Sequence, residues 1–325
     1  MFSKLLHFRE IDEQEWNRFI ECSPHGNIYH LYNYLTHLLE DWKAIMVYEG
    51  SELLAILPFS VKRKYLINYA IQPIFSQYIG IIMKAYSDNT YKKYELQKKV
   101  IQTIHEAIPK DIHFFQYNFA PEYNYGMALR WLGWNQSIKY TYWVDISKGY
   151  EVFIGEAASH VRREIKKAQQ NGIRIEVENN PDLVIDILKL AKPELIKKLD
   201  QKYLKALSNN SSYFYSSGRS CTLIAYKDST PIAGMIYFLY KNKMIYYQGS
   251  TIPKYKNSGA MSLIISESVR ILGGNYTILD FDGSMIEPIE RFFRGFGAYP
   301  VPYFSYTLNN SPWLIQKILN LKANK

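Results

Sequence analysis

The sequence predicts a protein of two mixed α/β domains, in which helices surround mixed β-sheets. The first observation is its length, since 325 residues are more than one average domain holds. The second is its 47% hydrophobic content, which is enough for buried cores and excludes an intrinsically disordered chain. The third is that both halves show a similar order of elements: helical periodicity, a run of antiparallel strands, then a helix and further strands.

In the first half, Asp12 precedes a short helix with acidic residues in its first turn, a favourable placement at a helix N-terminus. Gly50-Ser51 separates two apolar runs and predicts a hairpin. Lys148-Gly149 is the expected domain boundary, so the first domain spans residues 1–148. The elements expected in order are helices at 11–20 and 29–39, strands at 42–48, 53–61 and 78–83, a helix at 91–108, a strand at 112–119, a helix at 123–132 and a strand at 141–145.

In the second half, expected to span residues 149–310, Asn171-Gly172 ends a helix because Asn and Gly tolerate the left-handed conformation. Pro193 marks a break or a new first turn within a longer helical stretch. The elements expected in order are a helix at 151–170 that is interrupted near Ser159, a strand at 173–177, a helical stretch at 182–207, strands at 221–226, 232–240 and 243–250, a helix at 262–272, a strand at 276–281, a short helix at 288–293 and a strand at 303–308.

The formal net charge of +9 is concentrated in one half of the chain. Residues 1–150 carry 16 Lys/Arg and 15 Asp/Glu, whereas residues 151–325 carry 23 and 15, and no histidine follows His160. This favours an anionic ligand in the second half, with a solvated basic surface as the alternative. Only Cys22 and Cys221 are present, which excludes a disulfide framework and a Cys-rich zinc site. The N-terminus has no signal peptide pattern and no run is apolar enough to span a membrane, so we expect a cytoplasmic protein.

Two carboxylates close one strand of the second half, in Ile278-Leu279-Asp280-Phe281-Asp282-Gly283-Ser284. The segment looks like the nucleophile motif of haloacid-dehalogenase phosphatases, but the chain lacks the downstream acidic pair that this chemistry needs. A metal site is not expected, because further carboxylate or His ligands are missing. Strand alternation predicts that Asp280 and Asp282 share one face of the sheet. Either carboxylate then serves as a base or binds an amine, unless both only hydrogen-bond the turn at Gly283.

A strand, a short loop and a helix N-terminus follow one another from Tyr246 to Leu272. Exposed backbone N–H groups and the helix dipole make such a junction an anion site, and Lys254 and Lys256 lie in its loop. Ser258 or Ser262 is expected to cap the helix.

Two further basic segments occur in the second half. Arg162 and Arg163 stand four residues before Lys166 and Lys167, so like charges repel on one helix, which favours a polyanion nearby over a solvated basic face. In the later segment Glu290-Arg291-Phe292-Phe293-Arg294-Gly295-Phe296-Gly297, arginines project from a tight aromatic turn. The 29 tyrosines fit either base stacking or ordinary strand packing.

Together these segments resemble the Fem-type aminoacyltransferases and the related tandem proteins of the GNAT (acyl-CoA N-acyltransferase) superfamily. The matching stretches are RREIKKAQQNG, YYQGSTIPKYKNSGAMSLIISESV, ILDFDGS, FFRGFGA (similar to the family's Phe-Lys-x-Gly-Phe-Gly) and, in the first half, QPIFSQYIGI. The resemblance implies two GNAT-like domains in tandem, each with a V-shaped split in its sheet. It also implies that residues 311–325 pack on the first domain, and that Arg294 stands where Fem proteins carry Lys.

The resemblance implies an N-acyltransferase that moves an acyl or aminoacyl group from acyl-CoA or aminoacyl-tRNA to an amine, such as that of a cell-envelope precursor, with no metal and no tightly bound cofactor. A backbone N–H near Gln248 to Ser250 would hold the oxyanion. The implied catalytic base is Asp280, Asp282 or Tyr247. The residues implied for the donor are Lys254, Lys256, Ser258, Gly259, Ala260 and Arg294, and those for an acceptor between the domains are Gln77, Tyr78, Arg162 and Arg163.

A non-catalytic protein is the alternative: a degenerate tandem GNAT-like chain that binds an anionic sugar-nucleotide or RNA. The loop before the helix at 262–272 favours this alternative. The pyrophosphate loop of acyl-CoA enzymes has the pattern Arg/Gln-x-x-Gly-x-Gly/Ala, and the corresponding positions of this chain are Lys256, Gly259 and Met261.

Overall fold

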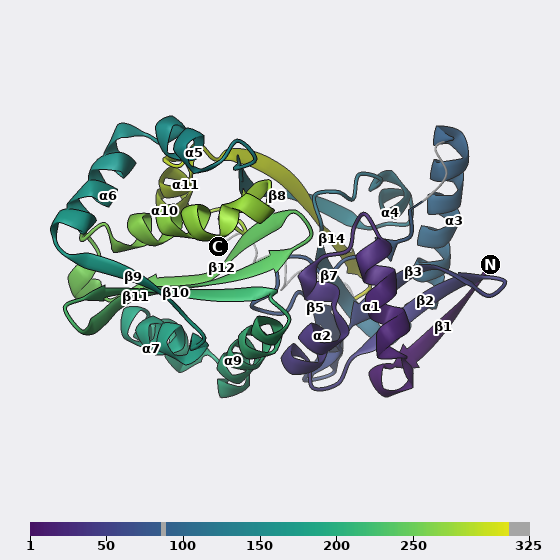
Figure 1. The fold of residues 1–325 in the computed structure, drawn as a ribbon. Coiled ribbons are helices and arrows are strands. Elements are labelled where there is room, and N and C mark those ends of the chain that lie inside the picture. The colour runs from purple at the N-terminus through teal and green to yellow at the C-terminus, as the bar shows by residue number, and fades with distance from the viewer. Residues whose placement is uncertain (86–88, 312–325) are drawn as a thin grey trace. The chain divides into compact units, whose positions relative to one another are not determined.

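The computed structural model describes residues 1–85 and 89–311, which form two compact units (Figure 1). Of the described residues, the first unit contains Met1–Lys139 and Pro302–Ser311, and the second contains Tyr140–Val301. These limits differ from the expected 1–148 and 149–310, because two long strands, β8 (Asn135–Asp145) and β14 (Tyr299–Asn309), each run from one unit into the other. The expected packing of residues 311–325 concerns a segment that, after Ser311, lies outside the described residues.

The first unit contains an antiparallel sheet in the order β1-β2-β3-β6, and strands in the order β4-β5-β7-β14. The expected hairpin at Gly50-Ser51 is confirmed, since Glu49 pairs with Glu52. Strand β1 was not predicted. The elements are β1 (Phe2–His7), α1 (Glu13–Cys22), α2 (Tyr32–Leu38), β2 (Lys43–Glu49), β3 (Glu52–Phe59), β4 (Lys62–Lys64), β5 (Ile67–Ile71), β6 (Ile82–Met83), α3 (Thr90–Ala107), β7 (Ile112–Phe119) and α4 (Met127–Trp131).

The second unit contains strands in the order β8-β13-β12-β11-β10-β9. Helices α5, α6, α10 and α11 lie on one side of this sheet and α7 and α9 on the other (Figure 1). The elements are α5 (Tyr150–Glu156), α6 (Ser159–Gln170), β9 (Ile173–Glu178), α7 (Pro181–Ala191), α8 (Pro193–Lys198), α9 (Gln201–Ser216), β10 (Ser220–Lys227), β11 (Thr230–Tyr240), β12 (Lys243–Thr251), α10 (Ala260–Leu272), β13 (Ile278–Asp280) and α11 (Glu287–Arg294).

Local sequence signals explain several boundaries in the second unit. The expected break at Pro193 is confirmed, because α7 ends two residues before it and α8 begins with it. Gly172 follows the end of α6 with φ +70°, as the Asn-Gly pair predicts. The three antiparallel strands β10, β11 and β12 are also confirmed. Their apolar side chains meet those of α6 and α10 in a core that includes Val161, Met235 and Ile264.

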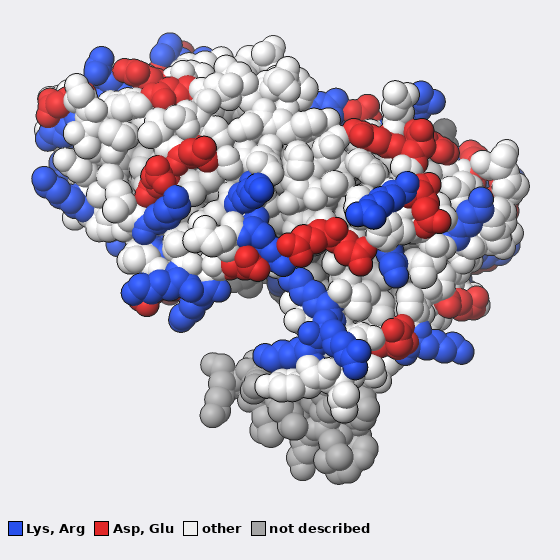
Figure 2. Space-filling view, turned by 90° about the horizontal axis from the view of Figure 1, so that it is seen from below, with Lys and Arg blue, Asp and Glu red and all other residues white. Residues whose placement is uncertain are grey.

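Figure 2 shows one face on which Lys and Arg side chains and Asp and Glu side chains are scattered among uncharged residues. Among the described residues, no helix combines the length and the apolar character needed to cross a membrane.

Candidate functional site

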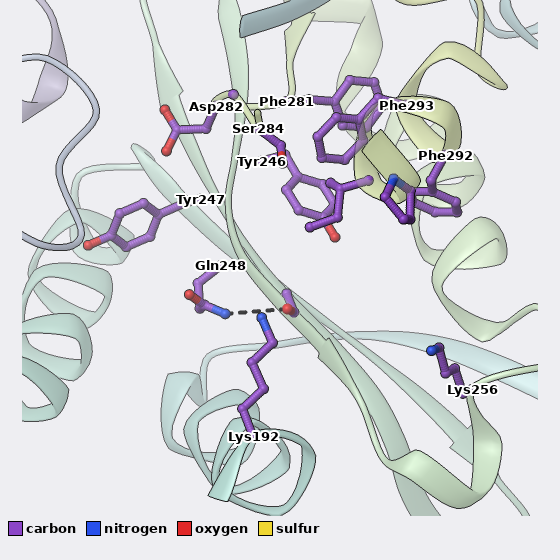
Figure 3. A pocket seen from close by; sticks show the side chains of 14 residues that line it. Lys192, Tyr246, Tyr247, Gln248, Lys256, Phe281, Asp282, Ser284, Phe292 and Phe293 are labelled. Atoms are coloured by element: carbon purple, nitrogen blue, oxygen red, sulfur yellow. Dashed lines mark hydrogen bonds between the residues drawn. The ribbon is translucent and has the colours of Figure 1, made fainter. Parts of the chain in front are cut away.

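The second unit has a pocket where two neighbouring strands part. Strands β12 and β13 are parallel and pair only from Lys243 to Ile245 with Ile278 to Asp280. Beyond this point they line a pocket of about 550 Å³ (Figure 3). Its lining consists of Lys192, Tyr246, Tyr247, Gln248, Gly249, Lys256, Phe281, Asp282, Gly283, Ser284, Pro288, Ile289, Phe292 and Phe293. Because β13 ends at Asp280, the ladder between these two strands stops there and the following part of β12 faces the pocket.

A β-bulge lies in the strand that forms one wall. Ile236 of β11 pairs with Gln248, but the next residue, Tyr237, pairs with Tyr246, so Tyr247 is the extra residue. Bulges redirect side chains and are common beside active sites. The Tyr247 ring packs on Phe238 with centroids 4.1 Å apart. Its hydroxyl end points away from the aromatic cluster at the other end of the pocket (Figure 3).

The two carboxylates predicted to share one face have different environments. Asp282 lines the pocket and has φ +56°, so the strand alternation on which the prediction relied ends at Asp280. Asp280 is 2% exposed and is absent from the described pocket lining. Its Oδ1 accepts hydrogen bonds from Thr141 Oγ1 (2.6 Å) and from the backbone N–H of Asp282 (3.0 Å). Asp280 therefore holds the turn, and Asp282 is the carboxylate that a ligand would meet.

Burial governs the protonation of two groups here. Burial raises the pKa of Asp280, while the nearby charge of Lys243 and the hydrogen bond from Thr141 oppose the rise. Burial also raises the pKa of Tyr246 far above the ordinary tyrosine value. The Tyr246 phenol therefore stays protonated and is no candidate base, which leaves Asp282 and Tyr247 as the candidates at the pocket.

An aromatic cluster that the sequence analysis did not assign to the site forms the opposite end of the pocket. Phe281 and Phe293 stack with centroids 4.3 Å apart. Tyr246 contacts both rings at 5.6 and 5.7 Å. Phe292 is half-buried beside them. The sequence predicts only a tight packing turn for the Phe-rich segment before Gly295. The parting of β12 and β13 brings this segment to a pocket.

The loop between β12 and α10 is held by helix α6. Gly259 has φ +79°, and a Cβ there would lie 2.3 Å from the backbone oxygen of Glu164. Lys167 Nζ donates to the backbone oxygen of Asn257 (3.1 Å). Gly259 occupies the N-cap position of α10 and no side chain caps the helix there, so the expected cap at Ser258 or Ser262 is wrong. Ser258 Oγ accepts from the N–H of Ala260 (3.2 Å). Ser262 donates instead to the Glu164 carboxylate (2.6 Å).

The predicted cations are only partly at the pocket. Lys256 lines it, whereas Lys254 extends over the Tyr255 ring at 5.5 Å and is not part of the described lining. Arg294, also outside that lining, bonds Glu290 through its Nε (2.9 Å). Counting back from Gly295-Phe296-Gly297 also places the Lys of the family pattern on Phe293 rather than on Arg294.

Lys192 lines the pocket and was missed. It lies between α7 and α8 with φ −136° and ψ 57°. Its ammonium points toward Gln248 (Figure 3). The Lys192-Pro193 pair is the sequence signal that could have predicted it. Because a residue before proline is pushed out of the helical region, this pair places a cation at a helix break.

None of the four residues predicted for the acceptor belongs to the described lining. Arg162 Nη1 donates to the backbone oxygens of Gly155 (2.6 Å) and Ala157 (2.8 Å) and fastens the turn between α5 and α6. Arg163 is exposed on α6. In the first unit, the Gln77 amide donates to the Tyr303 hydroxyl (2.8 Å), and the Tyr78 ring packs edge-on against Tyr303. Their roles in acceptor binding stay predictions.

Across residues 1–85 and 89–311, no group of three or more His, Cys, Asp or Glu side chains is placed to hold a metal ion.

No family model matches the sequence, and no curated protein matches it either. Solved structures do share its fold. FemX superposes with a TM-score of 0.67 at 12% identity, over 93% of this chain and 96% of FemX. A tandem GNAT protein from the clavulanic acid biosynthesis pathway gives 0.56 at 8% identity, over 95% and 99%. L-PGS from Bacillus licheniformis gives 0.55 at 13% identity, over 96% of each chain. The chain therefore has the Fem-type, tandem GNAT-like fold that its motifs predicted.

Proposed function

We propose that the protein is an N-acyltransferase whose second unit binds an acyl or aminoacyl donor in the pocket between β12 and β13. The observation that carries the proposal is the parting of these two parallel strands after Ile245 and Asp280, next to a loop that bears Lys256. A strand edge freed in this way offers backbone groups to an extended ligand. Proteins of this fold include FemX and a tandem GNAT protein of the clavulanic acid biosynthesis pathway, which was solved without AcCoA.

In this proposal the donor phosphate lies at Lys256 and at the backbone N–H groups where α10 begins. The acyl carbonyl lies along β12, where a backbone N–H near Gln248 to Ser250 stabilises the oxyanion. The acceptor amine attacks the carbonyl carbon and loses a proton to Asp282, directly or through a water. The bond to the donor's sulfur or ribose oxygen then breaks, and that leaving group takes up a proton.

Two donor classes satisfy this arrangement, an acyl-CoA and an aminoacyl-tRNA. Titration calorimetry with a series of CoA esters tests the first. We expect Lys256→Met to lose most of the binding heat, because its ammonium faces the pocket. Lys254→Met is the matched control: the same side chain two residues earlier in the same loop, but turned onto Tyr255. Equal losses in both variants would contradict the placement of the phosphate.

Filter binding with charged tRNA at two salt concentrations tests the second donor. A complex dominated by phosphate contacts weakens steeply with salt, and transfer of a labelled aminoacyl group to an amine, for example that of a cell-envelope precursor, then measures catalysis. If neither donor binds, the acyltransferase proposal fails. If a donor binds and no transfer occurs in wild type or in Asp282→Asn, the protein is a binding protein.

A further inference from the structure

A short basic hairpin in the first unit ends in two exposed apolar side chains. Strands β4 and β5 are closed by the pair Lys64 and Ile67, which leaves Tyr65 and Leu66 as the two residues of the turn. Tyr65 is 87% exposed and Leu66 82%. The three residues that precede them are Lys62, Arg63 and Lys64, and no acidic residue lies between positions 53 and 87.

The backbone at Tyr65, in the turn, has a conformation that is unfavourable for a tyrosine. Tyr65 has φ +55°, a left-handed conformation that glycine adopts with the least strain and that two-residue hairpins normally fill with Gly or Asn. Arg63 Nε donates to the Tyr65 backbone oxygen (3.2 Å) and helps to fix it. The Tyr65 side chain buries almost nothing in return. Folding alone would favour a glycine here, so the aromatic side chain indicates a role outside the fold.

Protection of the sheet edge explains only part of this pattern. Strand β4 is the last strand of its sheet, and lysines on an edge strand prevent pairing with other chains. That role accounts for the three cations. It does not account for an exposed Tyr and Leu at the tip, because apolar tips promote association rather than prevent it.

We propose that the β4–β5 hairpin docks the protein on the surface of a membrane rich in anionic lipid. Tyr is enriched at the level of the lipid headgroups, where its ring is buried and its hydroxyl stays wet. Leu66 would enter the adjoining acyl region, and the cations of β4 would meet the lipid charges. RNA is a less suitable partner, because Leu66 offers it neither a stacking surface nor a hydrogen bond. The hairpin belongs to the first unit, so this proposal does not depend on the acyltransferase proposal.

Co-sedimentation with vesicles tests the proposal without any substrate. We expect the full chain to bind phosphatidylcholine vesicles that contain phosphatidylglycerol much better than phosphatidylcholine alone, and to be released by salt. Arg63→Gln with Lys64→Gln should weaken binding about 30-fold, since each basic side chain near an anionic surface contributes about fivefold. The double variant Tyr65→Gly with Leu66→Ser should also weaken vesicle binding. Tyr65→Gly alone should not lower the thermal stability, because it removes the backbone strain at this position.

The matched control is the start of helix α3 in the same unit. Tyr91 is 76% exposed and is followed by Lys92 and Lys93, so Tyr91→Ser with Lys92→Gln removes the same kinds of side chain from a place without the strained turn. Unchanged vesicle binding in this control supports the hairpin. The proposal is overturned if the control loses as much as the hairpin variants, if anionic lipid makes no difference, or if the hairpin residues are required for binding to RNA and not to vesicles.

Discussion

Replacing Asp280 by alanine is expected to destabilise the protein by about 3 kcal/mol at neutral pH. The carboxylate is buried and receives the Thr141 hydroxyl and the Asp282 backbone N–H on one oxygen. Thr141 is fully buried, so its hydroxyl would lose its acceptor where water does not reach. A buried donor left without an acceptor costs about 1–3 kcal/mol, and two such losses exceed what is regained by removing a desolvated carboxylate.

Urea unfolding followed by fluorescence measures this change. Asp145→Ala is the matched control, because Asp145 lies on β8 four residues after Thr141 but is exposed, and its carboxylate accepts hydrogen bonds from the neighbouring Ser147. Its unfolding midpoint should move far less. Equal shifts for the two variants would refute the view that Asp280 anchors the turn at the pocket.

The pH dependence of stability gives a second readout of the same residue. Burial raises the pKa of Asp280, so the native state holds this proton more tightly than the unfolded chain, whose Asp titrates near 4. The contribution of Asp280 to stability is therefore most favourable below that value, and declines as the pH rises toward the native pKa. Asp280→Asn lacks this decline. Its stability relative to wild type should increase from about pH 4 upward, and a constant difference would contradict the direction of the pKa shift.

Two further predictions concern the loop before α10 and the cysteines. Gly259→Ala should lower the free energy of unfolding by about 2 kcal/mol, because Gly259 has a positive φ and the backbone oxygen of Glu164 lies close to it. Gly172 has a similar φ but open space around it, so Gly172→Ala should lose less stability in the same thermal melt. Burial raises the pKa of Cys221 to about 11, whereas Cys22 is exposed, so a thiol reagent near neutral pH should modify Cys22 quickly and Cys221 only on unfolding. Rapid modification of both thiols in the folded protein would contradict the burial of Cys221 on β10.

Much of the fold could be predicted from local signals. Gly50-Ser51, Asn171-Gly172 and Pro193 each fix a backbone conformation through their own chemistry, and the structure has the expected turn, helix end and helix break at these points. The domain limits could not be read in this way. They depend on β8 and β14, each of which has residues in both units. How these strands pair with distant segments cannot be deduced from the composition at Lys148-Gly149.

The order of elements along the chain predicts the strand, loop and helix that border the pocket, but it does not predict which side chains line the pocket. The loop with Lys256 and Gly259 follows directly from a strand, a turn and a helix. Which of Asp280 and Asp282 faces a ligand depends on where β13 stops pairing, because the left-handed backbone at Asp282 cancels the alternation of side chains. Lys192 reaches the pocket from a helix break more than fifty residues earlier in the chain.

A crystal structure of the protein with a non-hydrolysable acyl-CoA, or with a stable analogue of the aminoacyl end of tRNA, tests the central claim most directly. The account predicts the acyl group between Tyr246–Gly249 and Phe281–Ser284, with a phosphate beside Lys256 and the start of α10. Bound ligand elsewhere on the second unit, with this pocket empty and both strands unchanged, would contradict it.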